Sequence, residues 1–220
     1  MDTRTLFSDE LNRLRQEIFA MAVRVEENLG KALIALRTRN ADLAKEVRAD
    51  DAEVDDLQIK IEDEAAIIIA TQQPVARDLR ELVTIFKLTS NVERIGDYAV
   101  HLAKAAKKLA KSESPFSAQE HLEKMADTGR KMIRAAISSF MEQDSDAARR
   151  AASMDAVIDE EHKALTENVL KLMKKNSCVV KDAVQILNTS NQLERLGDHI
   201  TNICEAVVYM IEGKHEELNE

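Results

Sequence analysis

The sequence predicts an all-α protein of two tandem three-helix bundles related by internal duplication, six long helices in all. The 220 residues include only 5 Gly and 2 Pro, and aromatic residues make up 3% of the chain. So few turn formers and aromatics argue against a sheet-rich fold, whereas abundant Ala, Leu, Glu, Lys and Arg favour long helices. Apolar residues recur every three or four positions, and one five-residue motif occurs twice. Together these features predict both the helices and the duplication.

The first three helices are predicted at about residues 4–39, 42–71 and 75–111. In the first, Leu11, Leu14, Ile18, Met21, Val25 and Ala32 step by three and four, which gives one apolar face for packing on partner helices. Asn40 separates the first two segments. Pro74 stands where a helix can begin but cannot continue, so it marks the start of the third.

The other three helices are predicted at about residues 117–142, 146–175 and 179–213. Ser117 and Glu120 have the spacing of a capping box, which would start the fourth helix. Short connections between long helices force antiparallel neighbours. The break near Ser112–Pro115 therefore divides the chain into a first bundle at 1–112 and a second at 116–220.

The internal repeat is the strongest signal in the chain. The segment Glu93-Arg94-Ile95-Gly96-Asp97 recurs as Glu194-Arg195-Leu196-Gly197-Asp198, at an offset of 101 residues (194 − 93). A looser match relates Asp51-Ala52-Glu53-Val54-Asp55 to Asp155-Ala156-Val157-Ile158-Asp159, at an offset of 104 residues (155 − 51). A loop between the second and third helices of each half can absorb the difference.

Each repeated segment carries two acids four residues apart, which are neighbours on one helix face. All four pairs flank the apolar face of their helix, and if the second and third helices of each half pack side by side, four carboxylates gather in each half. Clustered carboxylates stay ionised together only beside a cation, and oxygen ligands favour Mg, Mn, Ca or iron. The candidate metal ligands are Asp51, Asp55, Glu93, Asp97, Asp155, Asp159, Glu194 and Asp198.

A structural interpretation of the same residues stays open. Acids at the edge of a helix seam commonly pair with Lys or Arg, and Arg94 and Arg195 stand inside the motifs. Likewise, Gly96 and Gly197 allow either a close approach of two helices or room for a metal cluster. One further donor is His101, four residues after Asp97 on the same face. Its counterpart in the second half is Asn202, so the two sites would differ.

No catalytic constellation is found. The chain has no Gly-rich phosphate loop and no GxSxG motif. The Glu-x-x-His pairs of di-iron carboxylate bundles do not occur in a repeated pattern. His121, His162 and His215 show no partner pattern and are expected at the surface. The sequence thus predicts a protein that acts by binding and is not an enzyme.

Charge and hydropathy limit the partners and the location. The chain has 40 acidic and 31 basic residues and a net charge of −9, which argues against nucleic acid and favours cations. No uninterrupted apolar run, Ala65–Ala70 included, approaches the ~18 residues of a membrane span, and the N-terminus has no apolar segment of the secretory type. A cytoplasmic protein without membrane insertion is expected.

Three stretches carry a resemblance to a known family: Gln72–Arg80, Glu93–Ala99 and Glu194–Ile203, the last running on to Tyr209–Lys214. With the duplicated plan, they make the chain similar to the PhoU family of bacterial phosphate uptake and signalling over nearly its whole length. The resemblance implies a non-enzymatic cytoplasmic protein, a homodimer, with metal clusters at the eight acids named above. It also implies an adaptor between the ATPase subunit of the phosphate ABC transporter and the phosphate-sensing histidine kinase, which represses the phosphate regulon when phosphate is plentiful.

Two other functions fit the same architecture. One is a redox or storage protein that holds carboxylate-bound iron in a helical bundle, although the missing Glu-x-x-His pairs count against it. The other is a phosphate-channel accessory, or a general helical scaffold, without a role in signalling.

Overall fold

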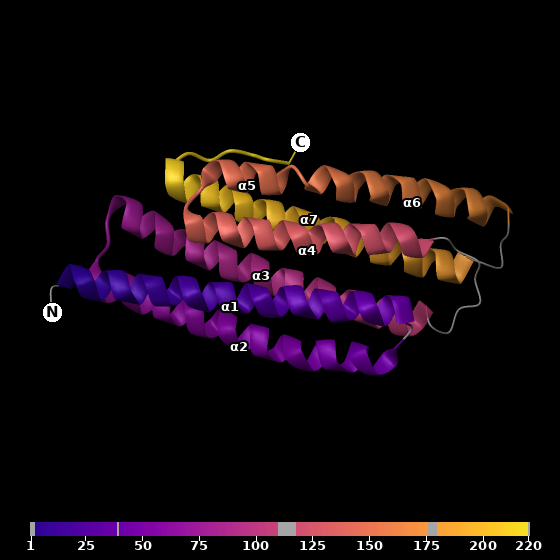
Figure 1. The fold of residues 1–220 in the computed structure, drawn as a ribbon, viewed down its shortest axis with the longest axis horizontal. Coiled ribbons are helices and arrows are strands. Elements are labelled where there is room, and N and C mark those ends of the chain that lie inside the picture. Colours follow the sequence, from indigo (N-terminus) through magenta and orange to yellow (C-terminus); the bar gives the residue numbers. More distant parts are fainter. Residues whose placement is uncertain (1–2, 39, 110–117, 176–179, 220) are drawn as a thin grey trace.

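Figure 1 shows a bundle of long helices in a computed structural model that describes residues 3–38, 40–109, 118–175 and 180–219. These residues form seven helices and no strand. The all-α prediction is confirmed, and the helix bounds follow the predicted ones closely. The helices are α1 (Thr3–Thr38), α2 (Ala41–Gln72), α3 (Ala76–Leu109), α4 (Ala118–Glu142), α5 (Ser145–Ala152), α6 (Asp155–Lys175) and α7 (Val180–Glu212).

Several helix ends have the side chains that the backbone requires. Asn40 caps α2, and its Oδ1 accepts hydrogen bonds from the N–H groups of Asp42 and Leu43. Asp144 does the same for α5 through the N–H of Ala147. Both satisfy N–H groups that have no partner within the helix. The predicted capping box at Ser117 lies outside the described residues.

The prediction of one continuous fifth helix at 146–175 is wrong. A turn at Ser153 and Met154 divides it into α5 and α6. The N–H of Met154 donates to the carbonyl of Ala151, three residues back, so the chain tightens there and the α-helical hydrogen bonds stop. As a result, Asp155 becomes the first residue of α6, where the helix dipole favours a negative charge.

Two bundles form and pack on each other. Helices α1, α2 and α3 pack together, and α4 packs with α5, α6 and α7; contacts of α1 with α4 and of α3 with α7 join the two groups. The buried apolar side chains of both bundles form one continuous cluster. The bundles therefore share a core. Because residues 110–117 are outside the described part, the domain limits 1–112 and 116–220 stay a prediction.

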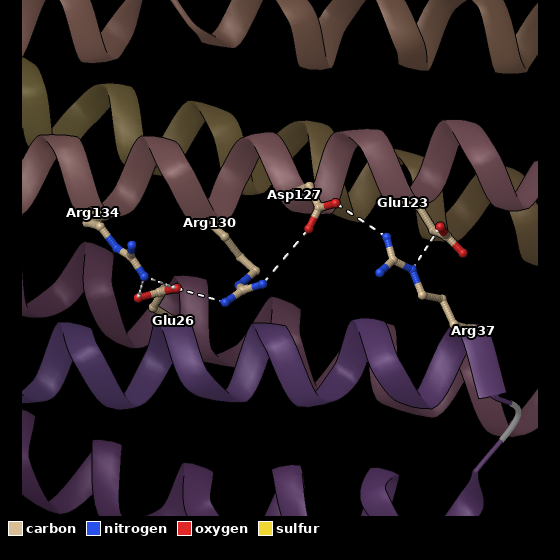
Figure 2. Close-up of polar contacts among 6 residues, drawn as sticks. All are labelled: Glu26, Arg37, Glu123, Asp127, Arg130 and Arg134. Atoms are coloured by element: carbon tan, nitrogen blue, oxygen red, sulfur yellow. Dashed lines mark hydrogen bonds and ion pairs between the residues drawn. The ribbon is translucent and has the colours of Figure 1, made fainter.

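The contact of α1 with α4 carries a row of ion pairs, drawn in Figure 2. Glu26 accepts from Arg130 at 3.0 Å and from Arg134 at 2.8 Å. Further along, Arg37 lies 2.8 Å from Glu123 and 3.3 Å from Asp127. This row fixes the register of the two bundles along the groove between α1 and α4.

The contact of α3 with α7 joins equivalent positions of the two repeats. Tyr98 and His199 are 101 residues apart (199 − 98), and their ring centres are 5.6 Å apart. His199 Nδ1 is 2.8 Å from Asn91 Oδ1, and burial lowers the pKa of His199. The two repeats thus meet near an approximate two-fold axis. None of the described helices is long and apolar enough to cross a membrane.

Candidate metal centres

The first group of carboxylates lies between α2 and α3. Burial raises the pKa of Asp51 to about 6, and the charges of Asp55 and Asp97 add to this rise. Burial also raises the pKa of Glu93, with further contributions from Asp97, Asp55 and Asp51. Because each acid acts on the others, the two helices bring the four predicted acids together. We call Asp51, Asp55, Glu93 and Asp97 the first cluster.

The second group lies between α6 and α7 and is buried more deeply. The Asp155 side chain is only 5% exposed. Burial raises its pKa to about 7, and the charges of Asp159, Asp198 and Glu194 add to the rise. The pKa values of Asp159 and Glu194 are raised as well, first by burial and then by Asp198. We call Asp155, Asp159, Glu194 and Asp198 the second cluster.

The two mid-helix glycines face one aspartate each. A β-carbon on Gly96 would lie 3.0 Å from Asp51 Oδ1, and one on Gly197 would lie 2.0 Å from Asp155 Oδ1. Real side chains avoid the second distance, so the absence of a side chain at Gly197 is what admits Asp155. The glycines therefore allow a close approach of two helices, which places a carboxylate in each groove. Their role in making room for a metal cluster stays a prediction.

Acids next to the first cluster are paired with bases on α1. Lys31 Nζ donates to Asp50 Oδ2 at 2.5 Å, and Arg24 forms an ion pair with Glu53. In contrast, neither Asp51 nor Asp55 has an ion pair with any residue that the structure describes. On α2, Asp50 and Glu53 thus pair with bases of α1, whereas Asp51 and Asp55 face the acids of α3.

In the second repeat, too, an acid next to the cluster pairs with bases of another helix, while the two acids of the repeated segment do not. Glu161 Oε2 is 2.6 Å from His121 Nδ1, and Glu161 also pairs with Lys124, both on α4. Asp155 and Asp159 make no ion pair within the described ranges. Asp55 and Asp159 are exposed to solvent, whereas Asp51 is partly buried and Asp155 is buried. In each repeat these two acids face two acids of the next helix.

The salt-bridge interpretation holds for part of the first cluster. Arg94 lies 3.2 Å from Asp97 and 3.5 Å from Glu93, so it already neutralises some of their charge. Arg195 makes no corresponding ion pair in the part of the chain described here. Asp198 instead accepts a hydrogen bond from Asn219 Nδ2 at 3.0 Å.

The second cluster shows the clearest fit to a cation. Asp155 Oδ1 is buried and has no hydrogen-bond partner at bonding distance among the described residues, although Thr201 lies near enough to oppose the rise in the pKa of Asp155. Such burial is costly for a carboxylate unless another group satisfies it. The eight acids offer only carboxylate oxygens as donor atoms, and oxygen donors suit hard cations. No three His, Cys, Asp or Glu side chains of the described segments already stand in the geometry of a metal site. Binding would therefore require the carboxylates to turn toward one another.

A family model described as the PhoU domain matches residues 9–106 and 122–207. The chain belongs to the PhoU family. The two matched segments are the two repeats, so each PhoU domain contains one cluster. A protein of Clostridium acetobutylicum named phosphate-specific transport system accessory protein PhoU homolog is 32% identical over 219 residues, which are 99% of this chain and 100% of that protein. The PhoU protein of Escherichia coli K12 is 30% identical over 209 residues, 94% of this chain and 86% of that protein.

Solved PhoU structures share the whole architecture. The crystal structure of PhoU from Pseudomonas aeruginosa has a TM-score of 0.90 at 30% identity and covers 94% of this chain and 100% of its own. The phosphate transport system regulatory protein PhoU from Streptococcus pneumoniae has a TM-score of 0.89 at 30% identity, covering 96% and 99%. The duplicated PhoU plan predicted from the repeat is thus confirmed.

Sequence reasoning missed two residues beside the second PhoU domain's cluster. His162, expected at the surface, is partly buried between α6 and α7. Asn219 reaches Asp198 because residues 213–219 fold back along α7, where the N–H of Leu218 donates to Glu205. His101, considered as a nitrogen donor for the first cluster, instead lies 2.9 Å from Gln192 Oε1 on α7. No pattern in the sequence pointed to His162 beforehand.

Proposed function

We propose that this PhoU-family protein is a non-enzymatic regulator of phosphate uptake and of phosphate-regulon signalling. It acts as an adaptor between the ATPase subunit of the phosphate ABC transporter and the phosphate-sensing histidine kinase, and it represses the regulon when phosphate is plentiful. The observation that supports this proposal most strongly is the full-length similarity to phosphate-specific transport system accessory proteins. Both partners present cytoplasmic surfaces, so we place the protein in the cytoplasm, as a homodimer.

The two clusters are the proposed control points. We assign Asp51, Asp55, Glu93 and Asp97 to one cation site, and Asp155, Asp159, Glu194 and Asp198 to the other. Iron, Mg, Mn or Ca would suit these oxygen donors. When bound, a cation neutralises the like charges that otherwise repel across each helix pair. The chain's own part is to hold these acids on two neighbouring helices while pairing the flanking acids with bases elsewhere.

Binding is the chemistry that this arrangement supports. In the first site, Arg94 would release Asp97 and Glu93 before they turn toward a cation. In the second, Asp155 is held against Gly197 and needs the least movement. Occupancy would thus change the charge between α2 and α3 and between α6 and α7, and it would change how these helices pack. A partner bound to the outer faces of these helices would then bind the two states with different affinity.

A reporter driven by a phosphate-controlled promoter tests the proposal. Deletion of the gene should leave the reporter expressed in high phosphate, and the parent gene should restore repression. Variants Glu93→Gln/Asp97→Asn and Glu194→Gln/Asp198→Asn should restore it less well than Glu217→Gln, an exposed acid outside both clusters, at equal protein levels. A pull-down at high and low phosphate should recover the ATPase subunit and the kinase.

Two outcomes would contradict the proposal in different ways. Repression that survives deletion would remove the signalling role and favour the phosphate-channel accessory. Oxygen-dependent oxidation of ferrous iron by the purified protein, lost in the cluster variants, would favour the iron redox or storage function.

A further inference from the structure

His162 lies in the same groove as the second cluster. It is three residues after Asp159 on α6, and its Nδ1 is 2.8 Å from Ser190 Oγ on α7. On α6, Asp159 is the neighbour of His162 on the same helix face. On α7, Glu194 follows Ser190 by four residues and lies on the same face as Ser190. His162 also opposes the rise in the pKa of both Asp159 and Glu194, as a nearby basic group does.

The hydrogen bonds around Ser190 determine which ring nitrogen of His162 carries the proton. The Ser190 hydroxyl lies 3.6 Å from Met125 Sδ and donates to it, because a thioether sulfur can only accept. With its proton assigned to Met125 Sδ, the hydroxyl oxygen presents a lone pair to His162, and in this tautomer Nδ1 is the N–H donor. Neutral imidazole then keeps its free lone pair on Nε2, which makes no hydrogen bond to any residue in the described ranges. A histidine fixed through Nδ1 with a free Nε2 has the arrangement of a metal ligand.

The first repeat lacks this feature. Its equivalent of His162 is Gln58, at the same 104-residue offset (162 − 58) as the aspartate pairs. Gln58 donates to Glu62 Oε1 at 2.9 Å, within its own helix. Thr89, the equivalent of Ser190, also donates to Glu62, at 3.4 Å. The Gln58 amide and the Thr89 hydroxyl thus both donate to Glu62. The first cluster therefore has only oxygen donors.

A second observation points to a ligand at this place and does not involve His162. Asp155 Oδ1 is buried, has no hydrogen-bond partner at bonding distance in the part of the chain that the structure describes, and lies against Gly197, between Glu194 and Asp198 along α7. The groove between α6 and α7 therefore contains one unsatisfied buried oxygen from the second cluster and, beside that cluster, one free imidazole nitrogen. Mixed nitrogen and oxygen donors suit Zn²⁺, Fe²⁺, Co²⁺ or Cu²⁺ better than Mg²⁺ or Ca²⁺.

We propose that His162 is a ligand of the second site through Nε2, so that this site selects a transition metal while the all-oxygen first site accepts a hard cation. The inference rests on the proposed binding of cations at the clusters. It makes the two repeats chemically unequal, although their acids are the same in number and spacing.

Pulsed electron paramagnetic resonance of the full chain with one equivalent of Cu²⁺ tests the ligand directly. The background variant Glu93→Gln/Asp97→Asn removes two carboxylates of the first cluster, so that Cu²⁺ does not bind there. In that background the spectrum should show the nitrogen modulation of a bound imidazole. His162→Gln, which installs the residue of the first repeat, should abolish this modulation. His121→Gln is the matched control, because His121 binds Glu161 outside the groove, and it should leave the modulation unchanged.

A competition experiment gives a second readout. The Zn²⁺ affinity of the second site should fall at least about tenfold in His162→Gln, with a smaller change for Mn²⁺. Cu²⁺ bound with no nitrogen signal in the background protein, or a signal that survives His162→Gln, would overturn the inference while leaving cation binding by the carboxylates intact. Asp155→Asn and Asp198→Asn can be added to the background variant. If Cu²⁺ then binds with unchanged affinity, both the inference about His162 and the proposed cation site at the second cluster would be overturned.

Discussion

Asp155 Oδ1 occupies the space that a side chain on Gly197 would need, since a β-carbon there would lie 2.0 Å from it. The equivalent pair in the first repeat is looser, with 3.0 Å between Asp51 Oδ1 and a β-carbon on Gly96. A glycine on the third helix of each repeat therefore receives an aspartate from the second helix. The tighter pair belongs to the cluster with the more deeply buried carboxylate.

Alanine at the two glycines should have different effects on stability. In a helix interior, Gly→Ala alone stabilises by ~1 kcal/mol. Near about pH 4, where folded Asp155 is protonated and its burial carries no charge, Gly197→Ala also forces Asp155 out of its place, so we expect a net loss of about 1–2 kcal/mol in the free energy of unfolding. Gly96→Ala should be nearly neutral, because Asp51 is only half-buried and can move. Urea denaturation of the metal-free proteins measures both changes, and equal effects at the two positions would show that the contact of Asp155 with Gly197 is not tight.

The raised pKa of Asp155 predicts how stability depends on pH. The pKa rises from 3.8 to about 7 on folding, so the folded state binds the extra proton and loses stability as pH rises between these values. At about 1.4 kcal/mol per unit, the cost at neutral pH is roughly 4 kcal/mol for this buried group. Asp155→Asn cannot ionise and should therefore stabilise the metal-free protein at pH 7.5.

Thermal denaturation across pH checks this expectation. The advantage of Asp155→Asn should be small near about pH 4 and should grow up to about pH 7. Added cation should stabilise the parent at pH 7.5 more than the variant. A variant that is less stable than the metal-free parent at every pH would mean that Asp155 is satisfied by groups within the fold.

Loss of Glu26 should loosen the contact between the two bundles. Glu26 accepts from both Arg130 and Arg134, so Glu26→Gln leaves Arg134 without a carboxylate among the described residues and Arg130 with Asp127 alone, at 3.9 Å. We expect a loss of about 1 kcal/mol, smaller at high salt because Arg134 is exposed. As a control, Asp42→Asn removes an exposed pair with Lys45 on one helix and should change stability by less than about 0.5 kcal/mol. Equal urea midpoints for the two variants would contradict a role for Glu26 in joining the bundles.

Much of the fold could be predicted from the sequence because its signals are local. Helical spacing of apolar residues and the positions of Asn40 and Pro74 gave the helices close to their observed bounds. The turn at Ser153 and Met154 could not be predicted, because no Gly or Pro marks it.

The candidate site was partly accessible for the same reason. Spacing of four residues placed each pair of acids on one face. Their position beside the apolar face indicated that the pairs meet if the second and third helices of each half pack side by side. The placement of His162 depends on Ser190, which is 28 residues away, and that of Asn219 on the return of the chain end along α7. Both are tertiary contacts without a local sequence signal. Which acids face bases on α1 or α4 also became clear only from the packing.

Metal content is the most direct test of the central claim that the repeated carboxylates form two cation sites. Elemental analysis of protein purified from cells grown with added metals should find metal in the parent. Asp97→Ala should lose about half of it, as should Asp198→Ala, and the double variant should lose nearly all. Glu53→Ala, in the same α2 segment but paired with Arg24, should keep the parental content. No metal in the parent, or unchanged metal in the double variant, would contradict the account and leave the eight acids with a structural role.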